Sequence, residues 1–404
     1  MRSVQEHLTA CLAAVGPLPP LDVVLPDAVG CILAEDVLAP GDLPVADLAG
    51  VDGYAVRAAD VADARPENPT LLRVTDEVRA GQADRLRLVA RAAVRIASGA
   101  PLPGEADAVV PVEQTDFGSA EVAVRTAVTS GENVRRRAED LRAGAVVLPA
   151  GERVGARQVA LLAAAGRGRV SVHPRPRVVI VSVGDELVEP GRPAQPGQVY
   201  DANGHALATA VQDAGASTFR VAAVPDERRR LRETLEDQLV RADLVITTGG
   251  LSYGGNDTVK EVLAPLGTVR FDNVAMWPGR QLGVGHIGDG TPIFCLPGDP
   301  VAVQVAYETF VRPALRTMAG YAELYRPSVP AAVTTGWYSP HGRREFVRVH
   351  LTGTPADGYR AEPTGSPAAL LLSALARANA FAVVPEDVTD VRAGDRLHCL
   401  LLES

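Results

Sequence analysis

Polar residues and glycines that could do chemistry follow three largely apolar runs of the chain. The runs cover residues 178–181, 243–248 and 292–296. The residues that follow them are Asp185, Glu186, Asp201, Asn203, Gly249, Gly250, Gly254, Gly255, Asp257, Gly298 and Asp299. Backbone N–H groups in glycine turns can approach phosphate oxygens, whereas carboxylates repel phosphate unless a hard cation such as Mg²⁺ lies between them. The pattern indicates a phosphate or pyrophosphate site with Mg²⁺, although it contains neither the Walker A motif nor G-x-G-x-x-G.

Several of these acidic residues have a structural alternative. Asp299 precedes Pro300, the arrangement of a helix N-cap followed by proline at the first helical position, and capping is the commoner role for it. Asp257 or Thr258 could cap a second helix, with metal binding by Asp257 equally compatible, and Asp226 is a cap candidate before a third. These residues therefore have two interpretations each.

Other polar residues near the runs are weighed in the same way. Glu186 is harder to assign to a cap, because Asp185 is the more natural cap in that turn. Thr258 and Glu261 have the spacing of a capping box. The isolated histidines His205 and His286 are interpreted as structural residues rather than metal ligands.

The elements that must position these residues form an α/β pattern. Each apolar run leads through a turn into a stretch of helical periodicity, which predicts an open parallel sheet with its ligand beyond the carboxyl ends of the strands. The helices of this region are expected at 204–213, 226–241, 257–264 and 300–318, with Gly215 just after the end of the first. Further helices are expected at 3–14, 26–34 and 154–165.

Two other regions read as short strands separated by turns. Strands at 51–56, 71–78, 86–89, 93–99, 107–113 and 121–128 predict a β-rich insert, and those at 331–338, 344–351, 358–363, 381–385 and 396–402 predict a small barrel or sandwich. A chain of 404 residues should form several domains. Their predicted limits are 1–46 and 137–173 for a segmented helical linker domain, 47–136 for the insert, 174–326 for the α/β domain and 327–404 for the C-terminal β domain.

Composition excludes some classes of function. A net charge of −9 disfavours nucleic-acid binding as the main activity, which rests on a dense cationic face. The four cysteines are far apart with no C-x-x-C spacing, which favours reduced thiols in a cytoplasm. The N-terminus has neither a basic leader nor an 18-residue apolar run, so neither secretion nor membrane spanning is expected. Among the 40 basic residues only Lys260 is a lysine.

Several motifs in order give the chain a family resemblance. They are VDGYAVR at 51–57, IASGAPLPGEADAVVPVE at 96–113, NVRRRAEDLRAG at 133–144, VSVGDELVEPG at 181–191, VYDANG at 199–204, TTGGLSYGGNDTVKEVL at 247–263, LPGDPVAV at 296–303 and GRREFVRV at 342–349. Over nearly its full length the chain resembles the molybdopterin molybdenumtransferases, the family of bacterial MoeA and the gephyrin E domain. The resemblance implies a linker domain, a β insert, a molybdopterin-binding α/β domain, a C-terminal barrel and an elongated homodimer.

The resemblance also implies a reaction. It is the insertion of molybdate into adenylylated molybdopterin with release of AMP, which forms the molybdenum cofactor. Mg²⁺ would neutralise phosphate charge and polarise the scissile anhydride there. By motif position, the acidic functional residues are Asp52, Glu186, Asp226 and Asp257, with Glu186 and Asp257 expected to hold the metal. The expected substrate-binding residues are Ser98, Gly249, Gly250, Ser252, Gly254, Arg280, Pro297, Gly298, Pro300, Arg348 and Ser366.

Four departures from the family pattern bear on activity. Asn273 and Trp277 replace two family lysines, so that only Arg280 keeps a charge in that run. Gly255 stands where Asp is usual, and Asp299 where Asn is usual. Because lost cations remove attraction for molybdate and phosphate, a second hypothesis is a carrier or scaffold that binds molybdopterin or its nucleotide and turns over poorly. A third, a nucleotide phosphohydrolase, is disfavoured because both flanking β regions also match the transferase family.

Overall fold

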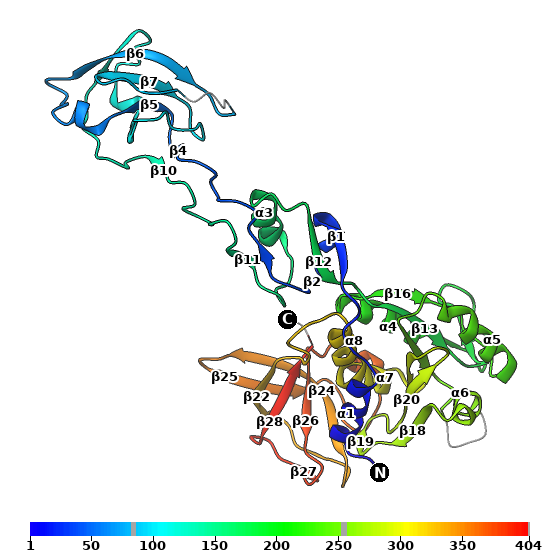
Figure 1. Ribbon diagram of the computed structural model, residues 1–404. Helices are drawn as coiled ribbons and strands as arrows, with labels where there is room; N and C mark the ends of the chain where they lie inside the picture. The colour runs from blue at the N-terminus through cyan, green and yellow to red at the C-terminus, as the bar shows by residue number, and fades with distance from the viewer. Residues whose placement is uncertain (82–85, 252–256, 403–404) are drawn as a thin grey trace. The chain divides into compact units, whose positions relative to one another are not determined.

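The computed structural model describes residues 1–81, 86–251 and 257–402. The chain divides into two compact units. The larger unit consists of Met1–Leu21, Gly30–Ala34 and Ser171–Ser404, and the smaller unit of Asp22–Val29 and Glu35–Val170. Figure 1 traces the elements of both.

A six-stranded sheet forms the centre of the larger unit. Its strand order is β16-β13-β17-β21-β20-β18. The strands are β13 (Arg177–Ser182), β16 (Ser217–Arg220), β17 (Leu244–Thr248), β18 (Val269–Asn273), β20 (Gln281–Ile287) and β21 (Thr291–Leu296). The strands β16, β13, β17 and β21 pair in parallel and confirm the predicted parallel sheet. The strands β20 and β18 add an antiparallel edge that the sequence did not predict. Glycines at 283 and 285 interrupt the apolar pattern of β20 and weaken its strand signal.

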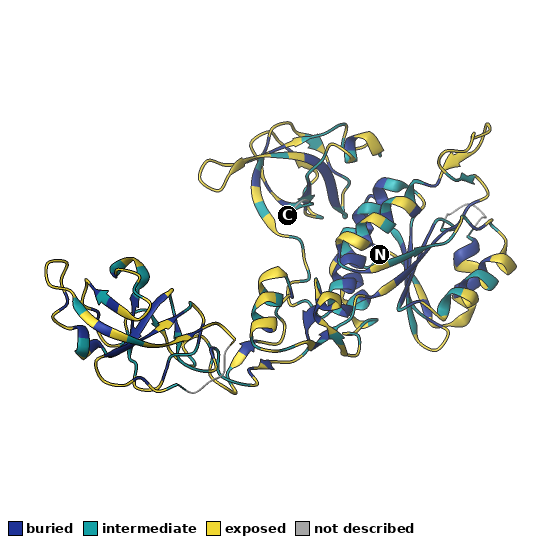
Figure 2. Cartoon of the chain, turned by 90° about the horizontal axis from the view of Figure 1, so that it is seen from above, coloured by how far each residue is buried: buried dark blue, intermediate teal, exposed yellow. Residues whose placement is uncertain are grey.

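Helices cover both faces of this sheet, as a doubly wound fold requires. They are α1 (Val4–Ala13), α4 (Ala202–Asp213), α5 (Arg228–Leu239), α6 (Thr258–Leu263), α7 (Pro300–Ala306) and α8 (Arg312–Met318). Alternate residues of β13 explain the two layers: Val178 and Ile180 pack in one apolar cluster with α1, α4, α7 and α8, and Val179 and Val181 in another with α5 and α6. In Figure 2 the strands are buried and the outer helix faces exposed.

Two predicted helices differ from those observed. The stretch 300–318 contains a π-helical segment, Tyr307–Val311, between α7 and α8. The stretch 26–34 gives only the short helix α2 (Leu25–Ala28), because Gly30 adopts a left-handed φ of 86° that ends helical geometry. A strand, β2 (Ile32–Leu33), follows and pairs with β12 (Arg169–His173).

The C-terminal part of the larger unit is a closed five-stranded barrel, one of the two predicted alternatives. Its strands are β22 (Ser328–Val333), β24 (Arg344–Thr354), β25 (Gly358–Pro363), β26 (Ala380–Val384) and β28 (Arg396–Leu401). The order β24-β25-β22-β28-β26 closes because β26 also pairs with β24. A short strand of the α/β region, β19 (Met276–Trp277), runs parallel to β24 and pairs Trp277 with Glu345.

The smaller unit contains the β-rich insert. Its five-stranded sheet has the order β8-β5-β7-β6-β9, with β5 (Gly53–Val56), β6 (Thr70–Val78), β7 (Ala92–Ile96), β8 (Ala108–Pro111) and β9 (Glu121–Val124). The predicted strand 86–89 contributes only an isolated bridge, Arg87 to Gly104. The helix α3 (Ala156–Ala164) and the strands β3 (Val37–Leu38) and β11 (Val146–Leu148) complete the linker part.

The remaining short elements connect these layers. They are β1 (Leu21–Val24), β4 (Leu48–Ala49), β10 (Val134–Arg135), β14 (Leu187–Val188), β15 (Val199–Tyr200), β23 (Trp337–Tyr338), β27 (Asp390–Val391), α9 (Leu372–Leu375) and the 3₁₀ turns Ala58–Val61, Val112–Gln114 and Ala264–Leu266. Within the described ranges, every helix is too short or too polar to cross a bilayer.

Candidate functional site

The candidate site lies at the carboxyl edge of the six-stranded sheet. The register of the parallel strands brings the ends of β13, β17 and β21 to this edge, since Thr248 pairs with both Ser182 and Leu296. Because β20 and β18 run antiparallel, the first residue of β20 and the last of β18, Gln281 and Asn273, meet at the same edge. Residues far apart in sequence therefore converge there.

Asn203 ties three of these segments together. Its Nδ2 donates to the Thr248 hydroxyl at 3.0 Å and to the Gly298 carbonyl at 2.8 Å. The Thr248 hydroxyl donates in turn to the Pro297 carbonyl at 2.7 Å. Among the described residues, the buried Oδ1 of Asn203 has no partner. The sequence placed Asn203 among the polar residues that follow the strands, and the structure shows that its amide fixes the spacing of the strand ends.

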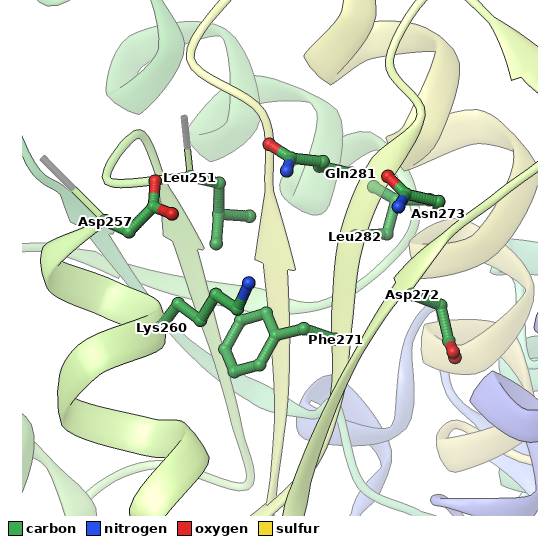
Figure 3. A pocket seen from close by; sticks show the side chains of 8 residues that line it. All are labelled: Leu251, Asp257, Lys260, Phe271, Asp272, Asn273, Gln281 and Leu282. Atoms are coloured by element: carbon green, nitrogen blue, oxygen red, sulfur yellow. The ribbon is translucent and has the colours of Figure 1, made fainter. Parts of the chain in front are cut away.

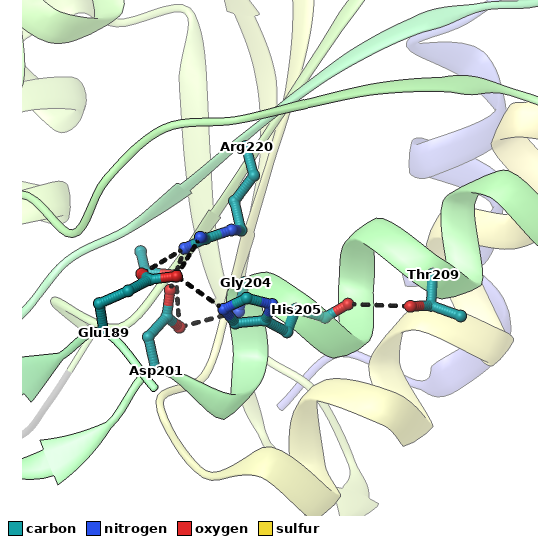
Figure 4. Close-up of polar contacts among 7 residues, drawn as sticks. Glu189, Asp201, Gly204, His205, Thr209 and Arg220 are labelled. Carbon is teal, nitrogen blue, oxygen red and sulfur yellow. Dashed lines mark hydrogen bonds and ion pairs between the residues drawn. The ribbon is translucent and has the colours of Figure 1, made fainter. Parts of the chain in front are cut away.

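Asp201 and Arg220 form the polar cluster of Figure 4. The Asp201 carboxylate accepts from the Ser182 hydroxyl at 2.9 Å and from the Gly204 N–H at 2.8 Å, which caps α4. Arg220 donates to Asp201 at 3.3 Å and to Glu189 at 3.0 Å. The Arg220 and His205 contacts lower the pKa of Glu189. Asp201 and His205 are thus structural residues, as the sequence indicated for His205.

Glu186 and Asp226 lie on the turns after β13 and β16. The Glu186 carboxylate sits close over Gly184, where a Cβ would lie 2.6 Å from its Oε2. Asp226 donates its N–H to the Asp185 carboxylate at 3.0 Å. The prediction that Asp226 caps the next helix is wrong, because α5 begins at Arg228 with Glu227 in the cap position. The buried Oδ1 of Asp226 has no hydrogen-bond partner in the described structure.

The structure separates the two remaining cap candidates. Asp299 caps α7, since its carboxylate accepts from the Ala302 N–H at 2.9 Å and Pro300 occupies the first turn. Asp257 holds the N-cap position of α6 without a side-chain cap bond. The proposed capping box of Thr258 with Glu261 does not form, because Glu261 pairs with Arg228 at 2.7 Å. Asp299 is therefore structural, and Asp257 is not explained by capping.

These carboxylates suit a hard cation. No group of three or more His, Cys, Asp or Glu with metal-binding geometry occurs in the parts of the chain that the structure describes. A Mg²⁺ ion however needs only one or two protein carboxylates beside substrate oxygens and water. The oxygen chemistry of Glu186 and Asp257 and the orphaned buried Oδ1 of Asp226 fit that requirement.

The glycine turn after β17 is constrained by its neighbours. Gly249 has φ 86°, and a Cβ there would lie 2.2 Å from the Val183 carbonyl, so only glycine fits. Its own N–H donates to the Pro297 carbonyl at 3.3 Å. Gly250 also has a positive φ, of 64°. The expected site residues Ser252 and Gly254, and the departure at Gly255, lie outside the described residues.

A pocket opens beside this turn (Figure 3). It has a volume of about 50 Å³. Leu251, Phe271 and Leu282 line its apolar floor, and Asp257, Lys260, Asn273 and Gln281 its polar rim. Of the expected site residues, Asp257 lies here, and Asn273, which replaces a family lysine, lies across from it. Lys260 and Gln281 were not among the site residues expected from the sequence. For Lys260 the signal was present, because it is the chain's only lysine.

The barrel residues Arg348 and Ser366 lie together. Arg348 is 2% exposed and donates to the carbonyls of Ser366 at 3.0 Å and Ala369 at 2.7 Å. Burial lowers the pKa of its guanidinium, and the charges of Glu345 and Asp299 act in the opposite direction. Because Asp299 directly follows Pro297 and Gly298, Arg348 lies within electrostatic range of that loop. Its Nε has no partner among the described residues.

Position 277, where Trp277 replaces a family lysine, lies against the barrel. Trp277 is half-buried and pairs through its backbone with Glu345 of the barrel. Arg280, which keeps the charge of this run, is also half-buried, and its carbonyl accepts from the Val274 N–H at 2.7 Å. Trp277 therefore belongs to the contact between the sheet edge and the barrel.

The two expected residues of the smaller unit also contact each other. The Asp52 carboxylate accepts from the Ser98 N–H at 2.7 Å, and the Ser98 hydroxyl donates to the Gly50 carbonyl at 3.2 Å. Ser98 thus helps to hold Asp52 on the turn that precedes β5.

Comparisons with known proteins cover nearly all of the chain. Residues 2–166 match the family model of the MoeA N-terminal region (domain I and II), 179–317 that of a probable molybdopterin binding domain, and 330–402 that of the MoeA C-terminal region (domain IV). Molybdopterin molybdenumtransferase 2 of Mycobacterium tuberculosis is 43% identical over 98% of both chains. The Bacillus subtilis molybdopterin molybdenumtransferase is 33% identical over 94% of this chain and 89% of its own.

A solved structure agrees with these matches. The molybdopterin biosynthesis MoeA protein from Pyrococcus horikoshii has a TM-score of 0.83 and 30% identity, over 100% of this chain and 99% of that chain. The architecture and the relatives lead to one family. The chain belongs to the MoeA, or molybdopterin molybdenumtransferase, family.

Proposed function

We propose that this protein inserts molybdenum from molybdate into adenylylated molybdopterin and releases AMP, as a step in molybdenum cofactor biosynthesis. One observation carries the proposal. The strand ends bring glycine turns, the carboxylates of Glu186 and Asp257 and the Pro297–Gly298 loop to one sheet edge, in a chain that matches the family over its whole length. Such an edge is where open α/β sheets bind ligands.

The chain's residues have distinct tasks in this proposal. The turns at Gly249–Gly250 and Pro297–Gly298 admit the substrate close to the backbone, and Asn203 holds their spacing through its bonds to Thr248 and Gly298. Arg348 and Arg280 supply positive charge for an oxyanion. Two backbone carbonyls anchor Arg348, and its Nε has no partner among the described residues. Fixed positions of this kind reduce the entropy that the reaction must lose.

Glu186 and Asp257 would hold Mg²⁺ in this proposal, with Asp226 supporting them. When bound, the ion would neutralise phosphate charge and polarise the anhydride. The buried Oδ1 of Asp226, which has no hydrogen-bond partner among the described residues, supports a cation nearby. The protein is further proposed to act as a cytoplasmic homodimer, without nucleic-acid or membrane partners.

A second candidate function rests on the replaced lysines. Asn273 is exposed at the pocket rim and uncharged, and Trp277 places an apolar ring at the barrel contact. Loss of both charges favours a carrier that binds molybdopterin or its nucleotide and turns over poorly.

A single-turnover assay separates the two functions. Adenylylated molybdopterin is mixed with an equal concentration of the protein, and the release of AMP is measured at a series of molybdate concentrations. Rapid release at micromolar molybdate is expected for the transferase. Tight binding without AMP release, even at high molybdate, would establish the carrier instead.

A further inference from the structure

The only lysine of the chain lines the pocket at the sheet edge. Lys260 lies on α6, one turn beyond Asp257, and both border the cavity that Asn273 and Gln281 close from the other side. In Figure 3 the Lys260 side chain extends along the Phe271 ring, and its ammonium points toward the space between Leu251 and Gln281. Lys260 and Asn273, which stands where the family has a lysine, thus line the same pocket.

Among the described residues, the ammonium of Lys260 has no ion-pair partner. Its neighbour Glu261 pairs with Arg228 at 2.7 Å. Asp272, which also lines the pocket, accepts from Arg2 and Arg270, each at 2.8 Å, and its carboxylate points away in Figure 3. In the described ranges no carboxylate forms an ion pair with Lys260. The usual structural explanation for a lysine at such a position, a surface salt bridge, is therefore absent among these residues.

The size and donors of the pocket suit a tetrahedral oxyanion. One water needs roughly 10–15 Å³ on this measure of volume. The cavity of about 50 Å³ therefore has room for a group of a few heavy atoms but not for a nucleoside. The Lys260 ammonium and the side-chain amides of Asn273 and Gln281 can all donate hydrogen bonds to a group in the pocket, which Asp257 also borders.

We propose that Lys260 binds an oxyanion at this pocket, either the phosphate of the nucleotide or molybdate itself, and supplies the charge that Asn273 lacks. The inference rests on the proposed function, because it assigns a residue to that reaction's anionic substrates. Asp257 repels an anion, so the oxyanion is expected between the Lys260 ammonium and the amides of Asn273 and Gln281. Position 273 can then be neutral without loss of binding, because one cation at the pocket is retained.

Chemical labelling tests this directly, because Lys260 is the only side-chain amine. The full-length protein is acetylated with an N-hydroxysuccinimide ester, and the rates at Lys260 and at the N-terminal amine are followed by peptide mass spectrometry. ADP is expected to slow Lys260 acetylation severalfold, with adenosine and the N-terminal amine as controls. Protection by molybdate but not by ADP would assign the oxyanion as molybdate. Protection by neither would overturn the proposal.

Binding of the protecting anion gives the second measurement. Lys260→Gln should weaken it about tenfold or more, as loss of a charged hydrogen bond does, whereas Lys260→Arg should retain most of the affinity. Arg228→Gln is the matched control, since it removes a nearby exposed cation that pairs with Glu261. Equal weakening by both glutamine variants would mean a general charge effect and no site. These experiments need no turnover, so a protein that fails the AMP-release assay can still show Lys260 protection.

Discussion

The Asn203 amide donates to the Thr248 hydroxyl at 3.0 Å, and so joins the start of α4 to the end of β17. The same amide holds the Gly298 carbonyl. Asn203→Ala removes both bonds, of which only the one to the Thr248 hydroxyl has a buried acceptor, so we expect a loss of about 1 kcal/mol in the free energy of unfolding. We also expect weaker ADP binding, because the spacing of the two turns is no longer fixed. Urea unfolding and calorimetry measure the two effects.

Asn379 offers the control for this variant. Its side chain also makes two hydrogen bonds, to the N–H and the carbonyl of Leu351, but within the barrel. Asn379→Ala should lower stability by a similar amount and leave ADP binding unchanged. If Asn203→Ala binds ADP as the parent does, the amide only stabilises the fold.

The proposed metal site predicts a coupling between Mg²⁺ and nucleotide. ADP should bind the parent more tightly with Mg²⁺ than without, and Glu186→Ala and Asp257→Ala should each remove most of that difference. The reason is that a hard cation needs carboxylate oxygens beside the phosphates. Calorimetry with and without Mg²⁺ gives the difference, with Glu233→Ala on α5, which pairs with Arg229, as the control. Unchanged Mg·ADP affinity in both site variants would leave these carboxylates with structural roles only.

The buried His7 predicts a pH dependence of stability. Its ring packs edge-on against Phe310 at 4.8 Å between centroids and is 1% exposed. Burial lowers the pKa of His7 from 6.5 to about 4, against the opposing charge of Asp272 and with that of Arg2. The unfolded chain therefore binds the proton more readily, and stability should be full above pH 6.5 and fall as the pH falls toward 4.

The size of the effect follows from the shift. At pH 5 the free energy of unfolding should be lower than at neutral pH by on the order of 2 kcal/mol. Urea unfolding of the parent and of His7→Leu at pH 7.5 and pH 5 measures it, and the variant should lose less stability than the parent between the two. His341→Ala, an exposed histidine, should keep the parent's pH dependence. If the parent and His7→Leu lose the same free energy of unfolding between pH 7.5 and pH 5, His7 does not cause the pH dependence.

Much of the fold was predictable because it depends on local periodicity. The runs that became β13, β17 and β21 are largely apolar and end at glycine-bearing turns, which is a strong signal for buried parallel strands. The family motifs identified the remaining layers. The antiparallel strand β20 was not predicted, because the glycines at 283 and 285 conceal its pattern.

The candidate site was predictable in composition but not in contacts. Capping of α7 by Asp299 follows from one local sequence pattern, and the structure confirms it. The role of Asn203 depends on strands far away in sequence, so no local pattern indicates it, whereas Lys260 is distinguished in the sequence only as the single lysine of the chain. Asp226 was assigned to a cap because α5 was expected to start two residues early. Helix ends are set by backbone hydrogen bonds that the sequence specifies weakly.

The assembly prediction concerns mass in solution. A homodimer is expected, so sedimentation at micromolar concentration should give about twice the chain mass of 42.3 kDa. Dilution over two decades with unchanged mass would indicate a stable dimer. A monomer at all concentrations would contradict the prediction and limit the site to residues of one chain.

The replaced lysines predict the effect of restoring charge. Asn273 is exposed at the pocket rim, so Asn273→Lys should be tolerated structurally and should strengthen anion binding. Trp277 is half-buried beside Glu345, so Trp277→Lys should cost about 1–3 kcal/mol of stability. The two variants therefore require separate tests before they are combined.

If attraction for molybdate limits the parent, Asn273→Lys with Trp277→Lys should raise the rate of AMP release at micromolar molybdate. Each charge-assisted contact is worth roughly 1.5–3 kcal/mol, or about tenfold to a hundredfold in rate when it acts in the transition state. If instead Arg280 and Lys260 already supply the charge, the parent should release AMP rapidly and the added lysines should change little. Combining Asn273→Lys with Lys260→Gln decides between these cases. If that double variant releases AMP as fast as the parent at micromolar molybdate, one cation at the pocket suffices, whichever side it comes from. If its AMP release is slower than that of the parent, the charge must stand on α6.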